Sequence, residues 1–166
     1  NLINAKFIFK KPNRADILLF DFTNENYLKK IVNMKIEVLY IRLEQINFFI
    51  IFKTIINCGF FNFNINYIIT YISYVRPKII LTFNDLHPTF YLIKNKIKNN
   101  KIITIAVQSG FRSKFNFLHF EKRKKYSANI NLVFSKDQRE SYPKNISSKF
   151  ISTGSLHNNF YKKKNK

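Results

Sequence analysis

Two residues that could act as a general base follow one of the apolar runs of this chain. The segment Lys78–Phe83 is apolar, and Asp85 and His87 lie in the four residues after it. A carboxylate or an imidazole in such a turn can take a proton from a substrate hydroxyl. Asp85 is equally suited to cap the helix that Pro88 would begin, and His87 to an ordinary surface position. The sequence therefore predicts Asp85 and His87 as catalytic candidates, with these structural roles as the alternative.

Arg112, after another apolar run, is a candidate for binding an anionic group. A guanidinium matches phosphate or carboxylate with two parallel hydrogen bonds. The adjoining Ser109-Gly110 backbone could add amide donors. The structural alternative is an ion pair of Arg112 with Asp85 or Glu44.

Short apolar runs alternate with helical patterns along the whole chain. This alternation predicts a parallel sheet with right-handed helical crossovers, that is, an α/β fold of the Rossmann-like, doubly wound kind. The runs are nearly continuous, as expected for strands covered on both faces. The expected strands are residues 16–20, 36–41, 78–83, 102–107, 131–134 and 150–153.

Helices are predicted in five of the remaining segments. Asn47 is a suitable N-cap for a helix that Gly59 would end, and Asn64 for the next one. Ser135 is the expected cap of a short helix, and the segment 111–129 is expected to be irregular. The expected helices are residues 27–32, 48–58, 65–75, 88–98 and 136–142.

Polar residues just after each predicted strand are the candidate ligand-binding residues, because ligands bind outside the carboxyl ends of strands in an open parallel sheet. Two of the three glycines, Gly110 and Gly154, are among them, and glycine permits positive φ or a close approach. We expect Asp85, Arg112 and Asn158 to converge at this edge. The substrate-binding candidates are Asp21, Arg42, Glu44, Asn84, Gln108, Ser109, Gly110, Arg112, Gly154, Ser155 and Asn158.

The 166 residues carry a formal net charge of +20, from 29 lysines and arginines against nine acidic residues. A nucleic-acid or anionic-membrane partner is one explanation, and lysines scattered by a biased composition are the other. We expect no specific nucleic-acid binding, because no basic helix, helix-turn-helix pattern or RNA-binding aromatic motif is visible. Association with the inner surface of a membrane stays open.

The remaining composition narrows the class further. The single cysteine, Cys58, allows no intrachain disulfide, and no Cys/His cluster has zinc-site spacing. We therefore expect a cytoplasmic protein with no metal and no cofactor. The most apolar segment, 48–56, is interrupted by Lys53 and is too short to span a bilayer. No G-x-G-x-x-G, P-loop or G-x-S-x-G pattern is present, which argues against the corresponding nucleotide cradles and against an α/β-hydrolase.

Four segments occur in a recognisable order: PKIILTFND, ITIAVQSGFR, NLVFSKD and FISTGSLHNN. In this order they resemble bacterial surface carbohydrate biosynthesis proteins, which tend to carry a TFxDN strand exit, an IQNGxR turn and a GSxxNN turn. The early segments FKKPNRADILLFD and IRLEQIN also look like that family's start and its RGExIN turn. The chain departs from these patterns at Leu43, Gln45, Leu86, His87 and Ser109.

The layout is also similar to the N-terminal half of GT-B glycosyltransferases and UDP-N-acetylglucosamine 2-epimerases. The resemblance implies a GT-B-type N-terminal domain over residues 1–160, with residues 161–166 beginning a linker to a further domain. It implies transfer of a sugar from a nucleotide sugar to a saccharide acceptor in surface polysaccharide synthesis, such as that of lipopolysaccharide or capsule. A piece with only this domain is expected to be inactive alone.

Two alternatives to glycosyl transfer stand beside it. An epimerase-like enzyme would use positions resembling that family's motifs, which fall on Asp85, on Gly110 with Arg112, and on Gly154 with Asn158. Gln108, however, stands where the epimerases carry an acidic residue, and an amide cannot act as a carboxylate acid or base. The alternative from another class is a basic module that binds nucleic acid or an anionic membrane.

Overall fold

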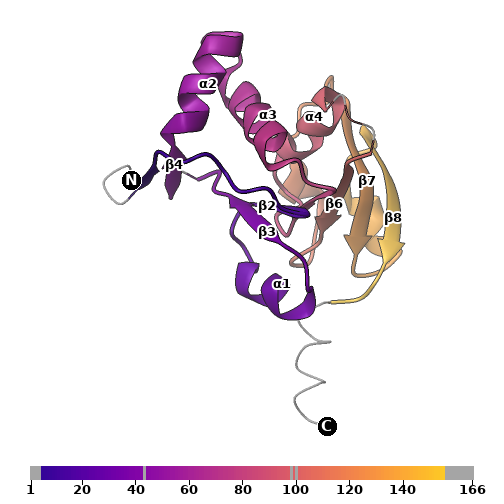
Figure 1. Cartoon of the computed structure of the whole chain (residues 1–166). Helices are drawn as coiled ribbons and strands as arrows, with labels where there is room; N and C mark the ends of the chain where they lie inside the picture. Colours follow the sequence, from indigo (N-terminus) through magenta and orange to yellow (C-terminus); the bar gives the residue numbers. More distant parts are fainter. Residues whose placement is uncertain (1–4, 43, 98, 100, 156–166) are drawn as a thin grey trace.

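A six-stranded parallel sheet forms the centre of the molecule (Figure 1). The computed structural model describes residues 5–42, 44–97, 99 and 101–155. The strand order is β3-β2-β5-β6-β7-β8, and every neighbouring pair is parallel. The strands are β2 (Ile17–Phe20), β3 (Ile36–Leu39), β5 (Ile79–Thr82), β6 (Ile103–Val107), β7 (Tyr126–Val133) and β8 (Ile146–Ser152).

Helices cover both faces of this sheet (Figure 1). On one face α1 (Glu25–Ile31) packs through Leu28 against Ile17 and Leu19 of β2. On the other face α3 (Phe63–Val75) and α4 (Pro88–Lys96) pack on Leu18 and Phe20. Successive residues of β2 thus serve opposite faces, and all four are buried, which confirms the prediction from the continuous apolar run. The α/β, Rossmann-like architecture is therefore as predicted.

A smaller parallel pair lies beside the main sheet. It consists of β1 (Lys6–Ile8) and β4 (Gln45–Asn47), and α2 (Phe48–Cys58) follows β4 directly. The Asn47 side chain accepts a hydrogen bond from Ile50 N at 3.1 Å, so the predicted N-cap of α2 is confirmed, as is its end at Gly59. Neither short strand was predicted, because three residues are too few to show an alternating pattern.

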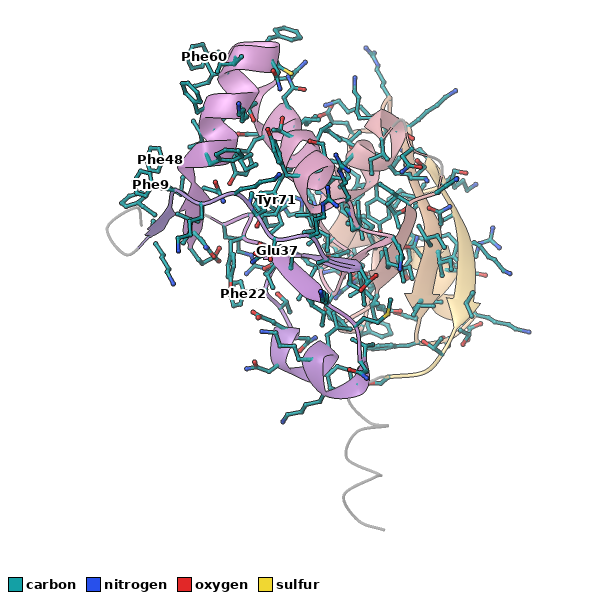
Figure 2. The ribbon with its side chains drawn as sticks, in the orientation of Figure 1. Phe9, Phe22, Glu37, Phe48, Phe60 and Tyr71 are labelled. Carbon is teal, nitrogen blue, oxygen red and sulfur yellow. The ribbon has the colours of Figure 1, made fainter. Side chains whose placement is uncertain are left out.

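The helix α3 is tied to the sheet by a polar contact as well as by its apolar face. The Tyr71 hydroxyl donates to Glu37 of β3 at 3.0 Å (Figure 2). The N-cap of α3 is Asn62 rather than the predicted Asn64, and its side chain makes no capping hydrogen bond. Asn62 has a φ of 48°, so the helix begins from a left-handed residue in the preceding turn and not from an Asx cap.

The later part of the chain holds more strand than its sequence predicted. The segment 111–129 was expected to be irregular, yet it contains the 3₁₀ helix η2 (Lys114–Phe117) and the beginning of β7. β7 and β8 each begin four or more residues before the predicted strands. Polar residues interrupt the apolar pattern in these early parts, so the sequence did not show them as buried strands. The helix expected over 136–142 is a 3₁₀ helix, η3 (Asp137–Ser141), and Lys136 precedes it in place of the predicted cap Ser135.

Within the described part of the chain, no single helix is long and apolar enough to cross a membrane. Only α2 and α3 taken together reach that length and composition, and they are bent by 111°.

Candidate functional site at the carboxyl edge of the sheet

The winding of the sheet reverses between β2 and β5. From β2 the chain passes through α1 to β3 on one side, and later returns to β5 on the other side of β2. Open α/β sheets bind ligands outside the carboxyl ends of the strands at such a reversal. Asp21 follows β2 at this point, and Asn84 to His87 follow β5.

Asp21, directly after β2, combines complete burial with an unusual backbone conformation. It is fully buried and has a φ of 82°, which residues other than glycine rarely adopt. Its Oδ2 accepts a hydrogen bond from Arg42 Nη2 at 2.7 Å, whereas its buried Oδ1 has no partner among the described residues. Backbone strain and an unpaired buried oxygen at one residue make Asp21 a candidate for ligand contact.

His87 lies beside this carboxylate and is also incompletely paired. Its ring packs edge-on against Phe20, with centroids 5.5 Å apart, and its buried Nδ1 has no partner among the described residues. Burial lowers the pKa of His87; the Asp21 carboxylate opposes this shift, and Arg42 and His119 add to it. The imidazole is therefore neutral at pH 7, with a nitrogen available to accept a proton.

The turn after β5 is built to present His87. The backbone N–H of Asn84 donates to Thr82 Oγ1 at 2.9 Å. The backbone carbonyl of Asn84 accepts a hydrogen bond from His87 N at 3.2 Å. His87 then serves as the N-cap position of α4 without a side-chain capping bond, and Pro88 occupies the first turn. Asn84 is thus placed as a positioning residue at the predicted edge.

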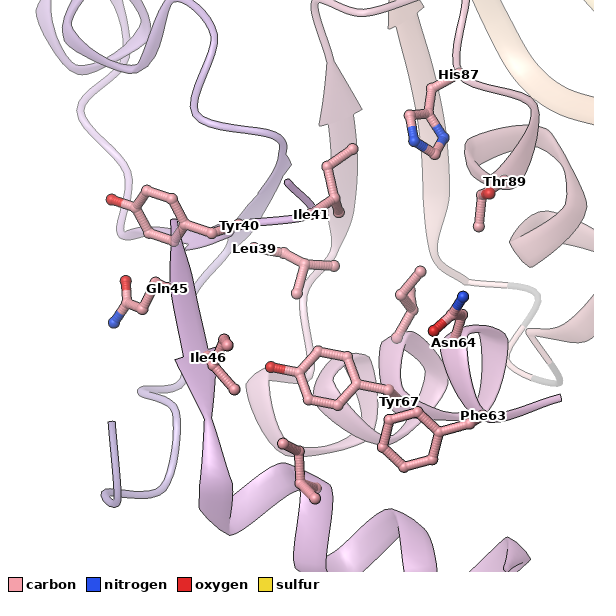
Figure 3. A pocket seen from close by; sticks show the side chains of 12 residues that line it. Leu39, Tyr40, Ile41, Gln45, Ile46, Phe63, Asn64, Tyr67, His87 and Thr89 are labelled. Atoms are coloured by element: carbon pink, nitrogen blue, oxygen red, sulfur yellow. The ribbon is translucent and has the colours of Figure 1, made fainter. Parts of the chain in front are cut away.

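A cavity of about 410 Å³ opens next to His87 (Figure 3). His87 and Thr89 line one end, Tyr40 and Gln45 another, and Tyr67 lies between them. Its walls are mainly apolar and aromatic, with a few polar groups, as is usual for small-ligand sites. The full lining is Leu39, Tyr40, Ile41, Gln45, Ile46, Ile51, Phe63, Asn64, Tyr67, Ile68, His87 and Thr89.

Glu44 directly precedes Gln45, the first residue of β4 and one of the residues that line this cavity. Its Oε2 is buried without a hydrogen-bond partner among the described residues. Of the two ion-pair partners considered for Arg112, Asp85 and Glu44, the structure pairs Arg112 with Asp85.

Arg112 pairs with Asp85 by two hydrogen bonds, from Nε to Oδ2 at 2.9 Å and from Nη2 to Oδ1 at 2.5 Å. Asp85 is 1% exposed and Arg112 8%. The Tyr142 hydroxyl donates to the same carboxylate at 2.5 Å. Burial, and then the Asp85 charge, raise the pKa of Tyr142, so this hydroxyl keeps its proton. Arg112 therefore forms the ion pair with Asp85 that was the structural alternative to binding an anionic ligand.

The turn after β6 is held by a network of amides. Gln108 Nε2 donates to the Gly110 carbonyl at 2.9 Å and to Gln138 Oε1 at 2.7 Å, and Gln108 Oε1 accepts from Phe134 N at 2.8 Å. Gln138 Oε1 also accepts from Arg112 N at 2.9 Å. Both donor hydrogens of Gln108 are used within the protein, so this residue is a structural member of the turn.

Ser109 and Gly110 lie next to the guanidinium of Arg112. Ser109 Oγ accepts from Arg112 Nη2 at 3.0 Å. Gly110 does not have positive φ; a Cβ there would stand 3.3 Å from Arg112 Nη1. A side chain at this position would therefore crowd the guanidinium, which would have to shift slightly.

The third predicted turn adjoins the end of β7: Gly154 N donates to the Phe134 carbonyl at 3.2 Å. Gly154 has a φ of 71°, as expected for a glycine turn, and Ser155 follows it. Both come after β8, the edge strand on the opposite side of the sheet from β3. Asn158 lies outside the described residues. Of the three residues expected to converge, the structure brings Asp85 and Arg112 together.

Several functional neighbours were missed by the sequence analysis. Tyr142 contacts Asp85 and Gln138 contacts Arg112 from far along the chain, and Tyr91 contacts Asp85 from the next helix, where it also reaches Asn131. The Tyr91 hydroxyl lies 3.1 Å from the Asp85 carbonyl and 3.2 Å from Asn131 Oδ1. None of them follows a strand end as a polar residue would, so the rule that found the other candidates could not find these.

Among the residues that the structure describes, no group of three or more His, Cys, Asp and Glu side chains could hold a metal ion. Comparisons with models of protein families, with curated proteins and with solved structures find no match to this chain. The fold and the edge site thus define a class only: an α/β protein with a parallel Rossmann-like sheet and a polar cluster where its winding reverses.

Proposed function

We propose that this chain is the acceptor-binding domain of a glycosyltransferase-like enzyme that acts in surface polysaccharide synthesis in the cytoplasm. The observation that carries the proposal is the group Asp21, Arg42 and His87. It has two unpaired buried polar atoms and lies at the reversal of the sheet, beside an aromatic cavity. The order of motifs that resemble surface carbohydrate proteins supplies the substrate class.

In this proposal His87 is the catalytic base. Its neutral imidazole accepts the proton of an acceptor hydroxyl as that oxygen bonds to the anomeric carbon of the donor sugar. The bond from that carbon to the phosphate oxygen breaks, and the nucleoside diphosphate leaves with the electron pair. The Asp21 carboxylate stabilises the imidazolium that forms, and Arg42 fixes Asp21 in place.

The cavity supplies the saccharide subsite in this proposal. The faces of Tyr40, Phe63 and Tyr67 can pack against the C–H surfaces of a sugar ring, and Asn64 and Thr89 offer polar atoms for its hydroxyls. Asp85 and Arg112 are positioning residues here: they hold the turn after β5 against the turn after β6. In GT-B enzymes the donor lies mainly on the second domain, so we expect this chain to bind a saccharide without turning over a nucleotide sugar.

Ligand-detected NMR with N-acetylglucosamine oligosaccharides and with UDP-N-acetylglucosamine tests the proposal. We expect saccharide contact in the wild type, at least tenfold weaker binding in His87→Asn and Arg42→Gln, and unchanged binding in Arg76→Gln. Arg76 is an exposed arginine before β5, at the opposite edge of the sheet. Absence of contact in the wild type, or equal losses in Arg42→Gln and Arg76→Gln, would contradict the site. Consumption of UDP-N-acetylglucosamine without an acceptor would favour the epimerase-like alternative.

Protein-observed NMR of the histidine rings across a pH titration reports the protonation state on which the base role depends. The His87 ring should titrate below the ordinary histidine value of about 6.5. Asp21→Asn removes a charge that favours the imidazolium, so the midpoint should fall further. A midpoint at or above 6.5 in the wild type would be incompatible with a neutral base held by burial.

A further inference from the structure

A row of large apolar side chains is exposed along β1, α2 and the turn after α2. Phe52 is 62% exposed, Phe60 77% and Phe61 80%. Figure 2 shows Phe9, Phe48 and Phe60 on the side of the molecule that faces away from the main sheet. We call this surface the aromatic edge; its members are Phe7, Phe9, Phe48, Phe52, Ile56, Phe60 and Phe61.

The aromatic edge is a continuous surface and not a set of scattered residues. Phe48, Phe52 and Ile56 recur every fourth residue and so share one face of α2, while Ile50 and Thr54 are buried on its other face. The Phe9 ring stacks on Phe48 with centroids 5.2 Å apart, and Phe7 contacts the same ring at 5.5 Å. A contiguous exposed apolar patch of this kind marks an interaction surface.

The charge around the aromatic edge is mainly positive. Lys6, Lys10 and Lys11 belong to the segment that carries β1, and Lys53 lies on α2. No aspartate or glutamate lies in residues 5–15 or 45–75, which hold β1, β4, α2 and α3. The adjoining acidic residue is Glu44, whose carbonyl accepts a hydrogen bond from Lys6 N at 2.9 Å and whose Oε2 is buried. Lysine side chains also lie over aromatic rings here, Lys11 over Tyr74 at 5.2 Å and Lys53 over Phe49 at 5.9 Å.

We propose that the aromatic edge docks this protein on the surface of an anionic lipid bilayer. The phenylalanines of α2 and its following turn enter the boundary between headgroups and acyl chains, and the flanking lysines meet the negative headgroups. A bilayer is the occupant that satisfies both properties. A second copy placed on the same surface would bring the same cations together, and the one adjoining acidic residue, Glu44, has a buried carboxylate oxygen. The inference stands apart from glycosyl transfer, since docking needs no saccharide.

Co-sedimentation with vesicles tests the docking surface. The whole chain is mixed with vesicles of phosphatidylglycerol and phosphatidylcholine, or of phosphatidylcholine alone, at low and high salt. We expect binding to the anionic vesicles, weakened by salt, and at least tenfold weaker binding for Phe52→Ser/Phe60→Ser. Lys6→Gln/Lys10→Gln should weaken binding by about fivefold for each lysine removed.

The matched control is Phe111→Ser/Phe115→Ser, which removes two phenylalanines that are at least as exposed, 75% and 80%, and lie outside the aromatic edge. Its vesicle binding should equal that of the wild type. Equal losses in the two double variants, or no wild-type binding to anionic vesicles, would overturn the proposal. So would a concentration-dependent dimer without lipid that Phe52→Ser/Phe60→Ser abolishes, because the surface would then belong to a second copy. Circular dichroism checks that each variant is folded.

Discussion

At the scale of single residues, burial decides what Asp85 and Arg112 do. Both were candidates for ligand contact. Both are buried and form a bidentate ion pair with each other, and the Tyr142 hydroxyl donates a further hydrogen bond to Asp85. A buried charge that loses its partner costs far more than an exposed one, because the remaining charge is left unsolvated. The pair therefore has a measurable signature in stability.

We expect Asp85→Asn to lower the free energy of unfolding by about 3–5 kcal/mol, as measured in urea. The control is Glu121→Gln, which breaks the exposed ion pair with Lys124 and should cost less than about 1 kcal/mol. Replacing both partners, Asp85→Asn with Arg112→Met, should recover part of the loss because no lone charge stays buried. A loss below about 1 kcal/mol for Asp85→Asn alone would show that the pair is not a structural element.

The sequence predicted the polar edge but could not rank its residues. It identified Asp85, His87, Asp21 and Arg42 because each follows a strand, and it named the Arg112 pair with Asp85 as an alternative. Which of these residues is buried in an internal hydrogen-bond network depends on partners that are distant in the sequence. Tyr142 is 57 residues from Asp85, and Gln138 is 30 from Gln108. No local pattern carries that information.

At the scale of elements, Asn47 joins three parts of the molecule. It ends β4, caps α2 through Ile50 N, and donates from Nδ2 to the carbonyl of Lys10 at 3.0 Å. The residue is 5% exposed, so water cannot readily replace these bonds. Its loss should loosen α2 and the segment after β1 together.

Asn47→Ala should destabilise the protein by about 1–3 kcal/mol, from the lost cap and the unpaired Lys10 carbonyl. Urea unfolding followed by circular dichroism measures it. Asn62→Gly is the matched control at the start of α3, where the asparagine makes no capping bond and has positive φ; it should change stability by less than about 0.5 kcal/mol. Equal effects of the two substitutions would refute the special role of Asn47.

The sequence predicted elements well where one physical signal dominated. Buried strands such as β2 and helices with a clear cap and stop such as α2 were found. The early parts of β7 and β8 were missed, because Ser127, Asn129 and Ser147 make these stretches look like turns. Their strand conformation comes from pairing with each other, with a register shift between Ser127 and Ile130, and that pairing is a tertiary effect.

At the scale of the whole molecule, the net charge of +20 opposes the compact state. The described residues form five ion pairs, and only the one between Arg112 and Asp85 has both partners buried. Exposed pairs contribute about 0–1 kcal/mol each and weaken as salt is added. Repulsion among the unpaired lysines is screened by the same salt, and the lysines far outnumber the pairs.

Salt should therefore stabilise this protein. Raising NaCl from about 0.01 M to 0.15 M shortens the screening length from about 30 Å to about 8 Å, which removes most long-range repulsion. We expect the midpoint of thermal unfolding to rise by several degrees, at about 2–4 °C for each kcal/mol gained. The variant Lys122→Glu/Lys125→Glu changes two exposed lysines, each by two charge units, and takes the net charge from +20 to +16. Its midpoint should be higher than that of the wild type at low salt and should rise less with NaCl. A midpoint that falls with salt would mean that attractive surface pairs outweigh the repulsion.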